Sequence, residues 1–404
     1  MATTIILFAT PFFFLLIFIE LYVNKKRNAG VYRLNDALTS LSLGVISQTK
    51  KLVIFSFAAI VYAWAPNSLA IFHLPQESVF TWIFGFIFYD FLYYWFHRVS
   101  HNINFLWASH VVHHQSEEYN LTTALRQTSS SVMPWIFYIP SFVVGIPAEV
   151  FFVSGALNLI YQYWVHTQLI GKLGWYESIF VTPSHHRVHH GQNEIYIDKN
   201  HGGVFILWDK WFGTFQEELD EEKVVYGVRR PLNSFNPIWA NLHTWFSLLS
   251  DAIRTKNWLD KLKIWFMPTG WRPTDVEERF PITKQPAGEQ IKYNPEPNQL
   301  IKLYTLIQYI FVVMFSVLFI QASMTLSFTA QLIIWCLITS PLLINGWLLE
   351  SKNHIKAIEL VRIILSAVAL YFLLDYFPNW IFIAGVLYLI VSILFLTFLS
   401  REST

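Results

Sequence analysis

The stretch SVFTWIFGFIFYDFLYYWFHRVSH, residues 78–101, decides the fold of this chain. Residues 78–96 are almost all apolar or aromatic, and their number is close to the ~20 residues that an α-helix needs to cross a bilayer. The stretch ends with His97 and His101, which are four positions apart and therefore share one face of a helix. It predicts a membrane-spanning helix that places two imidazoles on one side of the bilayer.

The composition of the whole chain agrees with a membrane protein. Of its 404 residues, 54% are hydrophobic and 14% are charged, whereas about a quarter of a soluble domain is charged. The mean hydropathy is +0.39. The net charge of +1 gives no general basic field, so no nucleic-acid partner is expected. The single cysteine, Cys336, excludes an intrachain disulfide framework and a cysteine-ligated zinc site.

Further apolar runs predict an all-α integral membrane protein, built as a multi-span helical bundle. The predicted spans lie near residues 4–23, 52–73, 78–96, 299–321, 327–348, 357–376 and 379–399. The first run is followed, not preceded, by Lys25, Lys26 and Arg27, which is the opposite of a cleaved signal peptide and indicates a retained span. Residues 36–50 predict an interfacial helix.

Two other segments complete the expected organisation. The apolar stretch 131–165 is interrupted by Pro140, Gly145 and Pro147, so two short helices are expected, in a hairpin that enters and leaves on one side. The polar section 167–298 contains many prolines and is interpreted as an irregular cap over the membrane helices. We therefore expect N-terminal spans in 1–74, a catalytic region with the histidine groups and the cap in 75–298, and a four-span membrane region in 299–404.

Basic residues predict the orientation of the bundle, because Lys and Arg accumulate in cytosolic connections. Lys25, Lys26, Arg27, Lys50 and Lys51 surround the first connection, which should be cytosolic. The third predicted span then ends in the cytosol at His97. All the histidine groups should lie on this cytosolic side, where a soluble reductant can reach them.

Histidines gather in three groups at helical spacing. Eleven of the 14 lie between His97 and His201. The groups are His97 and His101; His110, His113 and His114; His186, His189 and His190. Offsets of three and four place imidazoles on one helical face, and a bound metal satisfies many buried imidazoles at once.

A ninth candidate ligand, His166, ends the predicted hairpin. Nine imidazoles exceed the four ligands of one zinc site, so two ions are predicted. His201 is interpreted as a structural or supporting residue, and the isolated His73, His243 and His354 as ordinary polar side chains.

The residue types favour iron among the possible metals. Imidazole also suits zinc, copper and nickel. A hydrolytic dizinc site would normally include bridging carboxylates, and the HExxH pattern is absent from the sequence. Two Fe ions that activate O2 are therefore favoured, with no catalytic side chain beyond the metal ligands. A dizinc membrane hydrolase and a metal carrier remain distant alternatives, and a carrier would have its ligands midway along the spans.

Several side chains are candidates for supporting the ligands. Asp90 lies two turns before the first histidine group, and a carboxylate within a span needs a partner; a water-exposed carboxylate near the end of the span is the alternative. Glu117 and Glu118 follow the second group and could hold a ligand or face solvent. Gln162 precedes the hairpin histidine by one turn and could support it. His185 adjoins the third group but should point away from its shared face.

The motifs resemble a known family. HRVSH at 97–101, HVVHH at 110–114 and HRVHH at 186–190 are similar to the three histidine boxes of the fatty acid hydroxylase and sterol desaturase superfamily. Longer strings narrow the resemblance to a branch of that superfamily whose members cleave glyceryl ethers. They are HHQSEEYNLTTALRQ from His113, TPSHHRVHHGQN from Thr182 and DKNHGGVFILWDKWFGTF from Asp198. The likeness covers roughly residues 75–250.

The resemblance, and not the spacing, implies the reaction. Members of this branch hydroxylate the ether-linked carbon with O2 and tetrahydrobiopterin, and the hemiacetal falls apart to a fatty aldehyde and a glycerol derivative. The resemblance also implies that the eight histidines of the boxes bind metal and that His166 matches an additional hairpin histidine of the superfamily. The prediction of a pterin cofactor depends on the resemblance alone. The sequence does not identify the residues that would bind it or the electron donor. A close alternative keeps the site but acts on a sterol, a fatty acyl chain or another lipid.

Overall fold

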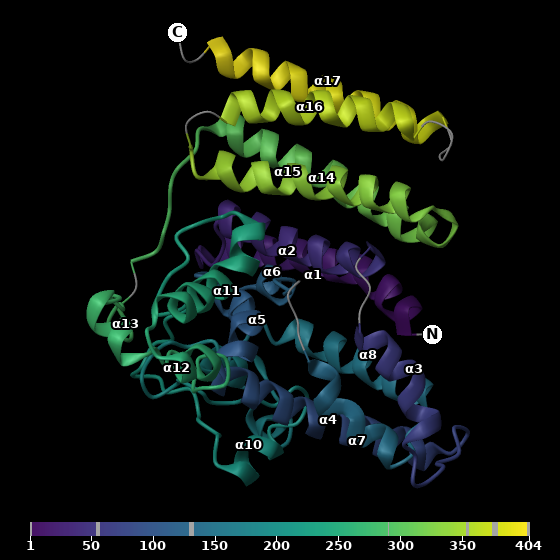
Figure 1. Ribbon diagram of the computed structural model, residues 1–404, viewed down its shortest axis with the longest axis vertical. Helices are drawn as coiled ribbons and strands as arrows, with labels where there is room; N and C mark the ends of the chain where they lie inside the picture. The colour runs from purple at the N-terminus through teal and green to yellow at the C-terminus, as the bar shows by residue number, and fades with distance from the viewer. Residues whose placement is uncertain are drawn as a thin grey trace. The chain divides into compact units, whose positions relative to one another are not determined.

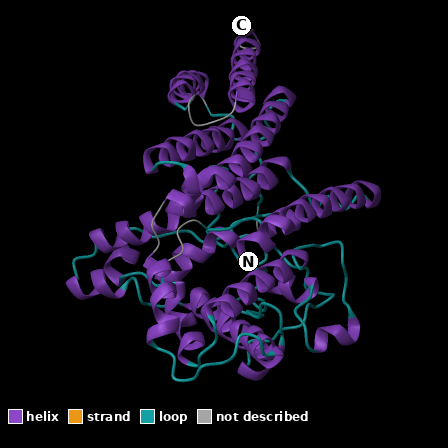
Figure 2. Ribbon diagram, turned by 90° about the vertical axis from the view of Figure 1, so that its right-hand side faces the viewer, coloured by secondary structure: helices purple, strands orange, loops and turns teal. Residues whose placement is uncertain are grey.

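The computed structural model describes residues 2–53, 57–128, 133–289, 291–352, 355–373 and 379–401. These ranges contain helices and loops, with isolated β-bridges and no β-strand (Figure 2). The predicted all-α class is therefore confirmed.

The chain divides into two compact units (Figure 1). Unit 1 comprises Met1–Arg33, Ser56–Leu232 and Asn241–Lys292, and unit 2 comprises Leu34–Phe55, Asn233–Ala240 and Tyr293–Thr404. The domain boundaries at residues 74 and 298 stay predictions from the sequence. In unit 2, helix α2 (Leu34–Val53) packs on α14 and α15 of the C-terminal section, where the sequence had grouped it with the N-terminal spans.

Unit 1 contains the helices that position the histidines. They are α1 (Ala2–Arg27), α3 (Phe57–Ser68), α4 (Val79–Asn102), α5 (Asn104–His114), α6 (Leu121–Ala124), α7 (Pro134–Val143), α8 (Ala148–Trp164), the 3-10 helix η1 (Gly174–Ser178), α9 (Pro183–His189), α10 (Leu207–Phe212), α12 (Trp258–Lys263) and α13 (Thr274–Arg279). Helix α11 (Pro237–Arg254) begins in unit 2 and continues into unit 1. The section expected to be an irregular cap thus contains an 18-residue helix, α11.

The predicted hairpin is formed by α7 and α8, which both pack on α4. The chain turns at Gly145, whose φ of +82° lies in the left-handed region. A Cβ at this position would lie 1.9 Å from the carbonyl oxygen of Phe72, so only glycine fits. Pro147, in extended conformation, then immediately precedes α8. Residues 131 and 132, at the predicted start of the hairpin, lie outside the described residues.

Five helical stretches of the described chain are long and apolar enough to cross a membrane. They are Phe8–Arg27, Val79–Asn102, Gln299–Thr325, Phe328–Leu349 and Asn379–Phe398. A sixth results if α2 and α3 count as one broken span. The chain is thus a multi-pass membrane protein with fewer full-length spans than the seven apolar runs suggested.

The predicted spans that fall short have physical explanations. In place of the run 52–73 the structure has only the 12-residue helix α3, and residues 54–56 are not described. Within 357–376 it has α16 (Ile355–Phe372), which contains Glu359 and Arg362, and residues 374–376 lie outside the described residues. Both charges are buried against each other, with Nε–Oε2 and Nη2–Oε1 distances of 2.7 and 2.6 Å. Charged residues lower the mean hydropathy of a span, although side chains of neighbouring helices can supply their hydrogen bonds.

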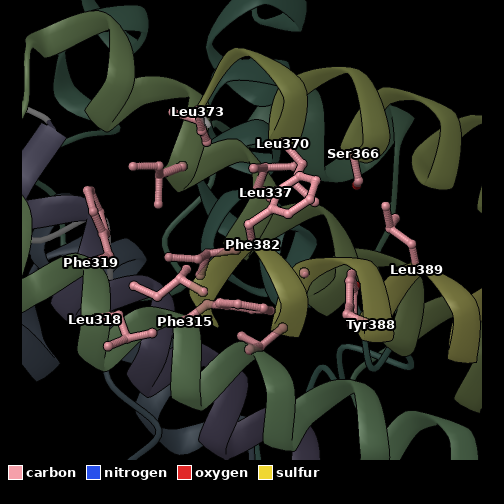
Figure 3. Close-up of a pocket in the computed structure, with 15 residues that line it drawn as sticks. Phe315, Leu318, Phe319, Leu337, Ser366, Leu370, Leu373, Phe382, Tyr388 and Leu389 are labelled. Carbon is pink, nitrogen blue, oxygen red and sulfur yellow. The ribbon is translucent and has the colours of Figure 1, made fainter. Parts of the chain in front are cut away.

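Unit 2 is a bundle of α2, α14 (Gln299–Ala322), the 3-10 helix η2 (Ser323–Thr325), α15 (Phe328–Leu349), α16 and α17 (Asn379–Arg401). Helices α14 to α17 lie side by side (Figure 1). An apolar cavity of about 90 Å³ between them is lined by side chains such as Phe315, Leu337 and Phe382 (Figure 3). Tyr388 also lines this cavity, and its hydroxyl accepts a hydrogen bond from Arg362.

Candidate metal centre

The nine histidines proposed as ligands converge in two groups within unit 1. The five-histidine group is His97, His101, His110, His114 and His189. The four-histidine group is His113, His166, His186 and His190. Within each group the candidate ligand nitrogens lie within 4.8 Å of one another. Four stretches of chain that are distant in sequence therefore meet at one place.

Short distances join neighbouring imidazoles inside each group. The distance from His110 Nε2 is 3.0 Å to His97 Nε2 and 3.1 Å to His114 Nε2. In the other group, the distance from His166 Nε2 is 3.2 Å to His113 Nε2 and 3.0 Å to His186 Nε2. Two nitrogens bound about 2.1 Å from one ion at right angles are about 3.0 Å apart. The spacing therefore fits a shared ion in each group.

Backbone carbonyls contact the Nδ1 atoms of four rings whose Nε2 atoms face the histidine groups. The Nδ1 atoms of His97, His113, His166 and His189 lie 2.8, 3.2, 2.7 and 3.0 Å from the carbonyl oxygens of His201, Arg126, Gln162 and Lys199, respectively. A neutral imidazole that donates from Nδ1 has its lone pair on Nε2. These carbonyls therefore orient the Nε2 lone pairs toward the centre of each group.

Three buried ring nitrogens of the described residues lack a hydrogen-bond partner, as expected for metal ligands. The Nε2 atoms of His101, His189 and His190 are buried and have no hydrogen-bond partner among the described residues. A buried polar atom without a partner is costly; one ion in the five-histidine group would satisfy His101 and His189, and one in the four-histidine group would satisfy His190. The two groups are thus consistent with a dimetal site, and His101 also belongs to a third candidate group, with Asp198 and His201.

Burial also keeps these rings in the form that binds metal. Loss of solvent, with the neighbouring imidazoles, lowers the pKa of His110, His114 and His190 well below the usual value. Burial lowers the pKa of His113 to about 3 and that of His166 to about 4. All five rings are therefore neutral at pH 7.

Local sequence explains how the rings converge. Ile103, in extended conformation, separates α4 from α5, so that α5 turns back and His110 faces His97. Helix α9 begins at Thr182, whose side chain accepts from the His185 amide. It ends before Gly191, where a Cβ would lie 3.0 Å from the Tyr196 side chain. Thr182 and Gly191 therefore bracket the helix that bears the third histidine group.

Asp90, a candidate for supporting the first histidine group, has no direct hydrogen bond to His97. Seven residues advance a helix by about 10 Å, which is too far for contact along the axis. Asp90 is fully buried, and its partners lie elsewhere. Its Oδ1 accepts from Asn158 Nδ2 and the Val204 amide, and its Oδ2 accepts from the Phe205 amide and Trp208 Nε1. Asp90 therefore anchors the loop that follows His201, whose carbonyl holds His97.

Of the other supporting candidates, the two glutamates pair with basic side chains, and the glutamine supports its histidine. Glu117 and Glu118 form ion pairs with Arg33, and Glu118 also pairs with Lys292 at 2.8 Å. Gln162 supports His166, but through its backbone carbonyl; its side-chain Oε1 accepts from Tyr93.

His185 belongs to neither histidine group. Its ring packs against Phe215, with the ring centroids 5.6 Å apart. It therefore does not share the face of its neighbour His186.

Sequence reasoning missed two carboxylates beside the centre. Asp198 Oδ1 lies 3.4 Å from His101 Nδ1. Asp209 is fully buried and accepts from the amides of His201 and Gly202, both at 2.7 Å. Both lie in the string DKNHGGVFILWDKWFGTF, where no helical spacing relates them to the histidine groups. The roles of the Lys199 and Arg126 carbonyls have no sequence signal, because every residue has a carbonyl.

Two cavities adjoin the histidines from different elements. One, of about 190 Å³, is lined by His97, His110, His113 and His166 and by side chains of α4 and α8 such as Tyr93, Phe96 and Leu159. The other, of about 360 Å³, is lined by His101, His114, His189 and His190 and by residues of the 227–284 section such as Arg230, His243 and Asp251. Each histidine group therefore meets both cavities.

Known proteins share the region that contains the two histidine groups. Residues 82–214 match the fatty acid hydroxylase family. The chain is 40% identical to the alkylglycerol monooxygenase of Homo sapiens over 362 residues, which is 88% of this chain and 80% of the relative. It is 36% identical to the alkylglycerol monooxygenases of Xenopus tropicalis and Danio rerio, each over 88% of this chain and 80% of the relative. No solved structure matches the chain.

Proposed function

Since the chain belongs to the alkylglycerol monooxygenase family, within the fatty acid hydroxylases, we propose that it cleaves the ether bond of alkylglycerols. The observation that supports this most is the convergence of nine imidazoles in two buried groups. An oxygenase needs such a site, whereas a lipid-binding or structural membrane protein does not.

The proposed reaction is a monooxygenation at the carbon next to the ether oxygen. One atom of O2 enters the C–H bond, and the other leaves as water with two electrons and two protons from a reductant. The hemiacetal product then loses its C–O bond, which gives a fatty aldehyde and a glycerol derivative. No protein nucleophile is needed for either step.

We propose that the nine histidines hold two iron ions. All the donors are neutral nitrogens, with no carboxylate in either group, and imidazole binds iron well. When bound, the two ions would supply the redox chemistry that activates O2. The carbonyls of His201, Arg126, Gln162 and Lys199 keep the rings oriented during that chemistry.

The smaller cavity is the proposed substrate site. It adjoins α4, a candidate span, so an alkyl chain can reach it from the bilayer. Phe96, Leu106 and Leu159 supply apolar contact, and the histidines form one wall. These side chains would hold the reacting C–H bond next to the metals and keep water away from it.

The larger cavity is the proposed site of the reductant, which we propose is tetrahydrobiopterin. Apart from His101, in the last turn of α4, none of its lining residues belongs to a candidate span. Trp107 and Trp271 offer aromatic faces, and Arg230, Ser247 and Asp251 offer polar groups to a heterocycle. By the distribution of Lys and Arg, we infer that this cavity opens toward the cytosol.

The test is an assay with purified protein in lipid nanodiscs, O2, tetrahydrobiopterin and a radiolabelled alkylglycerol. We expect a labelled fatty aldehyde from the wild-type protein. The His110→Ala variant should lose at least 100-fold in rate, because it removes a ring between two others in the five-histidine group. The matched control is His185→Ala, which removes a neighbouring histidine outside both groups and should keep most of the activity. A hydroxylated but uncleaved lipid, or turnover without O2, would contradict the proposal.

A further inference from the structure

Helix α11 has two apolar faces, and one of them is exposed. Leu248 and Ala252 are buried in a core cluster with Ala108 of α5. The other face presents Leu242, Phe246, Leu249 and Ile253, at offsets of four, three and four, which form one stripe along the helix. Their exposed fractions range from 39% to 69%. A helix that only covered a soluble domain would have polar residues on this stripe.

A second exposed stripe follows on α12 and the turn after it. Trp258, Leu259, Leu262 and Phe266 are 56–80% exposed. Ile264, in the same segment, is buried with Leu248 and Ala252. The stripe on α12 therefore lies opposite Ile264, and the stripe on α11 lies about 100° around the helix from Leu248 and Ala252. We call these eight residues, from Leu242 to Phe266, the outer apolar face.

Charges within the stretch 254–263 are mostly positive. Residues 254–263 contain Arg254, Lys256, Lys261 and Lys263 but only one acidic residue, Asp260. Arg254, Lys256 and Lys263 are exposed. Apolar side chains, a tryptophan and flanking lysines are the pattern of helices that lie in the plane of a membrane surface. Basic residues there are attracted to anionic headgroups.

The end of a candidate span lies directly beside this segment. The Asn102 carbonyl, at the end of α4, accepts a hydrogen bond from the Thr269 amide at 3.2 Å. The Asn104 and Phe105 amides donate to the carbonyls of Met267 and Trp265 at 3.0 and 2.9 Å. The bilayer surface is close to the end of a spanning helix. The segment after α12 is thus held at the level of that surface.

We propose that the outer apolar face of α11 and α12 inserts into the headgroup region of a phospholipid bilayer that contains anionic lipid. The span end, the apolar stripes and the basic flank all favour a membrane over a second protein. If the proposed function is correct, this contact also sets the depth of the metal centre. Helix α5 bears His110, His113 and His114 and packs through Ala108 on Leu248, Ala252 and Ile264, so ions held by these histidines would lie near the depth at which a glycerolipid has its ether bond.

Site-specific fluorescence in nanodiscs of phosphatidylcholine and phosphatidylglycerol tests this proposal without an activity readout. In a Cys336→Ser background, an NBD label is placed by Ile253→Cys or Leu262→Cys, one on each helix. Two quenchers are compared: a lipid with a nitroxide at acyl carbon 5, and iodide in the water. Ile83→Cys, on the exposed face of α4, is the lipid control, and Glu278→Cys, on α13, is the water control.

We expect both labels on the outer apolar face to be quenched by the nitroxide lipid at least three times more strongly than Glu278→Cys, and to resist iodide. Iodide quenching equal to that of Glu278→Cys would overturn the proposal, because the face would then be in water. Protection from both quenchers would also overturn it, because a protein partner or a second copy of the chain would then cover the face. Since neither result depends on turnover, failure here is distinguishable from failure of the proposed reaction.

Discussion

Asp90→Asn should destabilise unit 1 by about 3–5 kcal/mol. Each carboxylate oxygen of Asp90 accepts two hydrogen bonds, from Asn158 and Val204 on one oxygen and from Phe205 and Trp208 on the other. An amide NH2 in place of either oxygen removes two bonds and leaves two buried donors unpaired. Each unpaired donor costs about 1–3 kcal/mol, and the remaining bonds lose their charge assistance.

The assay is thermal unfolding in detergent, combined with metal content per chain. A loss of this size lowers the Tm by roughly 6–20 °C for a unit of this length. The metal content should fall as well, because the loop that positions the His201 carbonyl behind His97 loses its anchor. Glu278→Gln is the control, since this carboxylate on α13 is exposed and belongs to neither histidine group. A Tm of Asp90→Asn within 2 °C of the wild type, with full metal content, would refute the reasoning.

Three further predictions concern the hairpin, the unit 2 ion pair and pH. Gly145→Ala should sharply lower the yield of monodisperse protein in size-exclusion chromatography, because a Cβ would lie 1.9 Å from the Phe72 carbonyl oxygen; a normal yield contradicts this. Glu359→Gln should destabilise unit 2 by about 3–5 kcal/mol by leaving Arg362 buried without its charge partner. Adding Arg362→Met should restore part of that loss, and denaturant titration checks both variants. Metal-free protein should be fully stable above pH 6.5 and lose stability as the pH falls toward 4. Burial depresses the folded-state pKa of His166 to about 4, so the unfolded chain takes up that proton first, at a cost of about 3 kcal/mol by pH 4. Metal should protect against this loss, and a flat Tm between pH 7 and 4 in the metal-free protein would count against neutral buried imidazoles.

Local patterns predicted the parts of the site that depend on helical spacing. His97 and His101 share a face because they are four apart, and the same holds for His110 and His114, so sequence spacing alone indicates convergence. Hydropathy likewise located α4, because an apolar helix of that length has few alternatives. These features depend on neighbours within one or two turns.

Long-range contacts could not be predicted in the same way. The partners of Asp90 lie 68 to 118 residues away. The carbonyls that contact the imidazoles belong to the backbone, so residue type does not indicate which of them do so. The sequence also could not distinguish an apolar helix that faces lipid from one that packs on protein, which is why α3 and α16 differ from the predicted spans. The many prolines of the polar section led to the prediction of irregular structure where α11 forms. Its exposed stripe can be recognised only when the face that packs on α5 is known.

Metal stoichiometry of anaerobically purified protein tests the central claim most directly. Inductively coupled plasma mass spectrometry should find two iron ions per wild-type chain, and about one in variants that each remove two rings from a single group. Suitable variants are His97→Ala with His110→Ala, and His166→Ala with His186→Ala. A wild-type chain that binds no metal, or double variants that keep both ions, would contradict a centre built from these two histidine groups.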